Sequence, residues 1–147
     1  MSTDDLGPVL FAYDGSELAK HAIEEAGRQL ARGRPAVVLT VWRPFGVGFV
    51  PAGDREFDAA ASNEVRAAAQ ETAASGASLA EAAGFPATSI ERREAPTWKG
   101  ISHAAEESDA SLIVLGSHGK KGVAGVFAGS VADAVAAHSP RPVLIVH

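Results

Sequence analysis

Short apolar runs that alternate with longer helical segments are the feature of this sequence that most constrains its fold. Five runs have strand character, and they cover residues 8–13, 36–42, 88–93, 112–115 and 143–146. Helical segments fall between and beside them, over residues 17–32, 57–83, 97–108 and 130–138. This alternation is typical of a parallel sheet with helical crossovers. It predicts an α/β fold with one open, parallel, five-stranded sheet and helices on both faces.

The polarity of the runs predicts where each strand lies in the sheet. The runs at 36–42 and 112–115 are nearly all apolar, as strands covered on both faces must be, so we expect them to be central. The run at 88–93 is more polar and is expected at an edge. Ser16 and Ser130 are expected to be N-caps of the helices that follow them.

Length and composition favour a single intracellular domain and exclude several classes of function. We expect one domain over residues 1–147, a usual size for one core. The net charge of -5 argues against general affinity for nucleic acid or for anionic membranes. No run approaches the roughly 18 consecutive apolar residues of a membrane-spanning helix. The chain has no cysteine, which suits a reducing compartment, and we expect a cytoplasmic protein.

A glycine-rich segment between the fourth and fifth runs indicates a phosphate site. Its spacing is Gly116, two residues, Gly119, nine residues, then Gly129 and Ser130. Glycine admits a positive φ or a close approach to an anion. Ser130 and Val131 open a helix whose unpaired N–H groups favour an anion. The histidines are scattered and no zinc-ligand or P-loop spacing is present, so no dedicated metal site and no efficient catalysis are expected.

This loop, together with the Asp14-Gly15-Ser16 turn after the first run, resembles the universal stress protein family in its ATP-binding branch. The resemblance covers nearly the whole chain. It implies a Rossmann-like fold with strand order 3-2-1-4-5, an order that the sequence alone does not give. That order sets Asp14 and Gly116 side by side, at the point where the connections reverse and ligands bind.

The resemblance also implies the residues of an adenosine subsite. Asp14 matches the aspartate that lies against the adenosine end of the nucleotide, Val41 matches a main-chain contact to adenine, and Ala12 matches a neighbouring contact. Two alternatives stay open. Asp14 is also a good residue to cap the first helix, and Val41 suits plain core packing. Tyr13 is bulkier than the residue usual in the family, and its ring is expected to crowd or stack beside the pocket.

Further residues match the ribose and phosphate subsites of the family, with a purely structural turn as the alternative reading. The matching residues are Gly116, Gly119, Gly129, Ser130 and Val131, with Ser117 and His118 as neighbours.

The resemblance implies an ATP-binding regulatory protein of the stress response, with ATP bound alone or together with Mg²⁺. Three alternatives remain: a slow ATPase, a protein that binds another adenine nucleotide such as cyclic AMP, and one that binds none. The apolar run 143–146 follows Pro142 and suits an edge strand. In the family this strand forms the contact of a homodimer, which covers an edge that would otherwise be bare.

Overall fold

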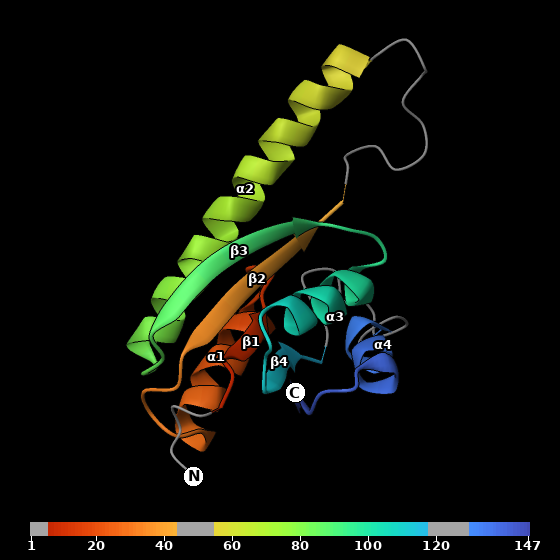
Figure 1. Ribbon diagram of the computed structural model, residues 1–147. Helices are drawn as coiled ribbons and strands as arrows, with labels where there is room; N and C mark the ends of the chain where they lie inside the picture. The colour runs from red at the N-terminus through yellow and green to blue at the C-terminus, as the bar shows by residue number, and fades with distance from the viewer. Residues whose placement is uncertain (1–5, 44–54, 118–129) are drawn as a thin grey trace.

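The structure is a computed structural model that describes residues 6–43, 55–117 and 130–147 (Figure 1). His118, Gly119 and Gly129 of the predicted site lie outside these residues. The elements in chain order are β1 (Val9–Ala12), α1 (Glu17–Gln29), β2 (Ala36–Trp42), α2 (Arg55–Ala82), β3 (Ala87–Arg93), α3 (Thr97–Glu107), β4 (Leu112–Gly116), α4 (Ser130–His138) and β5 (Val143–Val146).

The five strands form one parallel sheet in the order β3-β2-β1-β4-β5. The predicted fold class and strand order are therefore confirmed. The two nearly continuous apolar runs became β2 and β4, which flank β1 inside the sheet. The polar run became the edge strand β3, and the C-terminal run became the opposite edge.

Two hydrophobic clusters cover the two faces of the sheet, and β1 contributes to both. Val9 and Phe11 belong to the cluster under α1 and α2, where Phe11 meets Phe85 edge to face at 5.3 Å between ring centroids. Leu10 and Ala12 point the other way, into the cluster under α3 and α4. Figure 1 shows α3 and α4 side by side over that face. Strand alternation and helical crossovers thus bury both faces.

The predicted start of the first helix is confirmed. The Ser16 hydroxyl accepts a hydrogen bond from the Ala19 N–H at 3.1 Å, which satisfies one of the free donors of the first turn. Ser130 is the first residue of α4, one position inside the helix that it was expected to cap. The first helix ends at Gln29, three residues before the predicted 32, because Leu30 is already extended.

Helix α2 packs closely on the sheet because Gly76 leaves room for the Tyr13 ring. A Cβ on Gly76 would lie 2.6 Å from Tyr13 Cδ2 and 2.7 Å from Val38 Cγ1. Both side chains belong to the buried cluster of this face, so neither is free to move aside. Glycine lowers the stability of a helix interior by roughly 1 kcal/mol relative to alanine. At position 76 it also leaves the space that the bulky Tyr13 side chain occupies after β1.

We expect Gly76→Ala to destabilise the protein by about 1–3 kcal/mol, because overpacking outweighs the gain in helix propensity. Urea unfolding gives this free energy. Tyr13→Val is expected to relieve the part of the strain that comes from the ring and to leave the contact with Val38, so that the double variant is more stable than the sum of the two single changes predicts. Stabilisation by Gly76→Ala alone would show that the ring does not limit the approach of α2.

Candidate functional site

The carboxyl ends of β1, β2 and β4 lie together, because the three strands are parallel neighbours. They form the carboxyl edge of the sheet, which is the end where the strands finish and is distinct from the outer strands β3 and β5. After β1 the chain enters α1 on one face, whereas α4, which follows β4 in the chain order, packs on the other. The connections therefore reverse between β1 and β4. This is the place where open α/β sheets bind ligands.

The structure brings the described members of the predicted site to this edge. Ala12 ends β1 and Asp14 follows two residues later, Val41 is the last residue but one of β2, and Gly116 ends β4. Ser130 and Val131 open α4, which must start near this edge in order to return the chain to the amino end of β5. Both are exposed, with Val131 37% exposed.

Asp14 holds the turn that leads into α1, but it is not the cap of that helix. Its Oδ1 accepts a hydrogen bond from the Ser16 N–H at 2.9 Å, and Ser16 itself caps the helix. Gly15 between them has a φ of +81°, a conformation that glycine adopts without strain. Asp14 is exposed. The turn therefore fixes a carboxylate at the open end of β1.

Gly116 lies in close contact with α1. Its φ lies outside the left-handed region, and a Cβ there would lie 2.9 Å from Leu18 Cγ and 3.3 Å from the Leu18 carbonyl. The close approach at this position is that of α1. Ser117, expected to offer its backbone to a ligand, donates its N–H to the Val146 carbonyl at 2.8 Å. The ligand contacts expected at these two residues stay predictions, and both residues also have structural contacts of their own.

Val41 packs against α3, as the core-packing alternative anticipated. A Cβ on Gly100 would lie 3.0 Å from Val41 Cγ1, so α3 lies tightly on this side chain. Val41 and Ala12 both pack on the cluster under α3 and α4. The main-chain contact to adenine expected at Val41 stays a prediction.

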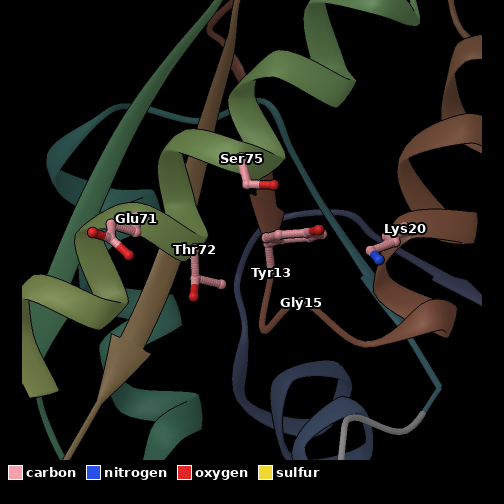
Figure 2. A pocket seen from close by; sticks show the side chains of 6 residues that line it. All are labelled: Tyr13, Gly15, Lys20, Glu71, Thr72 and Ser75. Carbon is pink, nitrogen blue, oxygen red and sulfur yellow. The ribbon is translucent and has the colours of Figure 1, made fainter.

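The Tyr13 side chain lies on the face of the sheet covered by α1 and α2, whereas Ala12 and Val41 lie on the face covered by α3 and α4. The expectation that its ring crowds or stacks beside the pocket stays a prediction. Figure 2 shows its ring between α1 and α2, beside an open hollow of about 260 Å³. Burial raises the pKa of the phenol, an effect that Lys20 and Ser75 partly offset. The hydroxyl makes no hydrogen bond of normal geometry with the described residues. The hollow is lined by Tyr13, Gly15, Lys20, Glu71, Thr72 and Ser75.

The sequence patterns did not indicate Thr40, a further residue near the carboxyl ends of these strands. Thr40 is 7% exposed, and its Oγ1 donates a hydrogen bond to the Tyr13 carbonyl at 2.9 Å. The available signal was a lone hydroxyl within the apolar run of β2.

A cluster of charged side chains lies at the carboxyl end of β3. Glu94 Oε1 accepts from Arg92 Nε at 2.7 Å, and its Oε2 lies 2.6 Å from His103 Nδ1. The hydrogen bond from Arg92 holds the pKa of the Glu94 carboxyl below its ordinary value, and the His103 contact acts in the same direction, while desolvation opposes both. Arg92 also pairs with Glu107 of α3 at 2.6 Å. These contacts tie α3 to the end of β3.

Residues 6–43, 55–117 and 130–147 contain neither a cluster of metal-ligand side chains nor a helix that could span a membrane. No group of three or more His, Cys, Asp or Glu side chains in these ranges is placed to hold a metal ion. No helix there has the length and apolar character needed to cross a membrane.

The topology and the edge define a Rossmann-like α/β protein with a candidate site at its switch point. The chain belongs to the universal stress protein family, whose pattern matches residues 6–147. The family resemblance of the two sequence motifs is thereby confirmed.

Relatives and solved structures agree with this assignment. A universal stress protein of Thermus aquaticus is 32% identical over 146 residues, 94% of this chain and 96% of its own length. One of Mycolicibacterium smegmatis is 32% identical over 147 residues, 95% of this chain, but the match spans only 45% of that longer protein. The structure of hypothetical protein MJ0577 is 25% identical with a TM-score of 0.80, and it covers 95% of this chain and 94% of its own. A universal stress protein in complex with cAMP is 27% identical with a TM-score of 0.64, over 96% of this chain and 97% of its own.

Glu94→Gln tests the charged cluster. Because the folded pKa of Glu94 is lowered, its carboxylate stabilises the fold above the unfolded pKa of about 4.3, and this contribution is lost as pH falls through the folded pKa. The free energy of unfolding of the wild type should therefore exceed that of the variant at pH 7 and converge with it in acid. Glu106→Gln, at an exposed carboxylate on α3, is the control. A difference that is the same at pH 3 and pH 7 would contradict the assignment.

Proposed function

We propose that this chain is an ATP-binding regulatory protein of the stress response, with its nucleotide at the carboxyl ends of β1, β2 and β4. The observation that carries the proposal is the convergence of the described predicted site residues on the switch point of the sheet. The relative solved with cAMP, 27% identical over 96% of this chain, supports an adenine nucleotide as the ligand.

The adenosine end of ATP would lie against Ala12, Asp14 and Val41. A carboxylate accepts hydrogen bonds from a ribose hydroxyl or from an exocyclic amine of the base, and the Asp14 carboxylate is exposed where β1 opens. Main-chain groups beside Val41 would contact the base while the valine side chain stays packed on α3. The residue types present therefore fit a nucleoside.

The phosphates would lie at the start of α4. This helix has nine residues, and its first N–H groups have no intrahelical partner. Ser130 adds a hydroxyl there, and the helix dipole favours an anion. Magnesium that accompanies ATP takes most of its ligands from phosphate and water. A dedicated cluster of protein ligands is therefore not required for Mg²⁺.

Cyclic AMP is the second candidate, because a related universal stress protein is solved with it. The two ligands share the adenosine subsite and differ at the phosphate end, where ATP carries two more phosphates. Calorimetric titration with each ligand, with and without Mg²⁺, separates them. Mass spectrometry of small molecules released from the purified, denatured protein identifies any ligand that co-purifies. The proposal fails if no adenine nucleotide co-purifies and none gives heat at millimolar concentration.

Asp14→Ala is expected to weaken ATP binding by about 10- to 100-fold, the value of one or two hydrogen bonds to a charged group. Its effect on stability should be small, because Asp14 is exposed and Ser16 still caps α1. Calorimetry measures the affinity and thermal unfolding measures the stability. Glu24→Ala removes the same charge from an exposed position of α1 and should bind ATP normally. Equal affinities in the two variants would remove Asp14 from the site.

The regulatory part of the proposal includes a homodimer paired through β5. This strand is short, apolar and at an edge. The carbonyls of Pro142 and Val146 accept hydrogen bonds from the β4 side, so the main-chain groups of Val143 and Ile145 face outward. A second copy of the strand would find its pairing groups there.

Ile145→Pro removes an outward N–H without touching the hydrogen bonds between β4 and β5, so it is expected to convert a dimer to a monomer. Light scattering coupled to gel filtration reads the mass. Circular dichroism checks that the variant keeps its fold. A wild-type monomer, or a folded variant that stays dimeric, would refute pairing through this edge.

A further inference from the structure

We infer that Thr40 is a positioning residue for the nucleotide, acting through the main chain that carries Asp14. The inference rests on the proposed function, since Asp14 is the adenosine contact of that proposal. Thr40 itself is buried under the edge and need not touch the ligand.

The hydroxyl of Thr40 holds the chain at the point where β1 leaves the sheet. Regular pairing of β1 with β2 ends at Ala12 and Leu39, so the Tyr13 carbonyl lies beyond the last paired residue. Thr40 Oγ1 donates to that carbonyl at 2.9 Å, and the Tyr13 N–H donates to the Leu39 carbonyl at 2.8 Å. Both main-chain groups of Tyr13 are therefore bonded to β2.

The hydrogen bond to the Tyr13 carbonyl also constrains Asp14, the next residue in the chain. The Tyr13 carbonyl and the Asp14 nitrogen belong to one planar peptide unit, so fixing the carbonyl also fixes the direction in which the chain continues. The turn at Gly15 and the bond from the Ser16 N–H to Asp14 Oδ1 then set the carboxylate. Without the Thr40 hydroxyl, the Tyr13 carbonyl loses this bond to β2, and the inference is that the position of the Asp14 carboxylate shifts as a result.

The local chemistry argues that the hydroxyl is there for this bond. β2 reads Ala-Val-Val-Leu-Thr-Val-Trp, and a valine would fit the space of Thr40 without a polar group to satisfy. A buried hydroxyl is costly unless it is hydrogen-bonded. At the opposite end of β1, far from the switch point, Ser111 Oγ donates to the Gly7 carbonyl at 2.7 Å and accepts from Arg34 Nη2 at 2.6 Å. Ser111→Ala therefore removes two hydrogen bonds, and ATP binding retained in this variant shows that loss of a hydroxyl beside β1 does not by itself weaken affinity.

The experiment compares Thr40→Val, Thr40→Ser and Ser111→Ala by calorimetry with ATP, by thermal unfolding, and by the NMR amide resonances of Ser16 and Ala19. The Ser16 amide reports on its bond to Asp14, and the Ala19 amide reports on the helix cap. Thr40→Val is expected to weaken ATP binding by about 5- to 30-fold, the effect of one buried hydrogen bond. It should also shift the Ser16 amide and leave the Ala19 amide in place. Thr40→Ser, which keeps the donor, and Ser111→Ala should bind within about twofold of the wild type.

Each outcome decides the inference. Loss of affinity in Thr40→Val with retention in the other two variants supports it. Wild-type affinity in Thr40→Val overturns it, and so does equal loss in Thr40→Val and Ser111→Ala, because that would be a general effect of stability. Thr40→Ala replaces Thr40→Val if the latter does not fold.

The failure of the proposed function gives a different result. If the wild-type protein binds no adenine nucleotide, that proposal fails, and the amide resonances alone decide the role of Thr40. A Ser16 shift in Thr40→Val that Thr40→Ser restores would still show that Thr40 positions Asp14. An unmoved Ser16 amide would overturn the inference.

Discussion

The pairing of β1 between β2 and β4 is the constraint on which the rest of the structure depends. β1 has only four residues, yet it has a partner on each side and hydrophobic clusters on both faces. Its register brings the carboxyl ends of three strands to the same end of the sheet, with β2 reaching three residues beyond the pair Ala12 and Leu39. Because the chain leaves β1 toward one face and α4 packs on the other, this end is also where the direction of the connections changes. The candidate site is a consequence of that pairing.

Small residues allow the helices to come close enough to make this edge well defined. Gly116 admits the start of α1, Gly76 admits the Tyr13 ring beneath α2, and Gly100 admits Val41 beneath α3. Each of these contacts joins a helix to the carboxyl half of a strand or to the residue that follows it. The helices are thereby tied to the same part of the sheet that presents Asp14. Close packing of these helices restricts movement of the main chain at the carboxyl ends of the strands.

The sequence alone predicted the elements and their layers, because strand and helix periodicities are local properties. It predicted that β2 and β4 are inner strands, since both are apolar on both faces. The strand order came from the family resemblance, because pairing between distant segments leaves little trace in one sequence. The close contact of Gly116 with Leu18 could not be predicted, because it joins two segments that are distant in the chain. The space for the Tyr13 ring depends on Gly76, a residue 63 positions away in the chain. The role of Thr40 depends on the level at which β1 ends, which no local pattern gives.

The two outer strands of the sheet, β3 and β5, differ in a way that affects how copies of this chain can associate. Along β3, Glu91 pairs with Arg66 at 3.0 Å and Arg92 pairs with Glu107 at 2.6 Å, so an incoming strand would have to displace ion pairs and desolvate them. β5 carries only apolar side chains and has four residues. A sheet with one receptive edge can accept a single additional strand. In two copies joined through β5, the strands left at the outer edges would be the two copies of β3, and their ion pairs would oppose open-ended growth into fibrils.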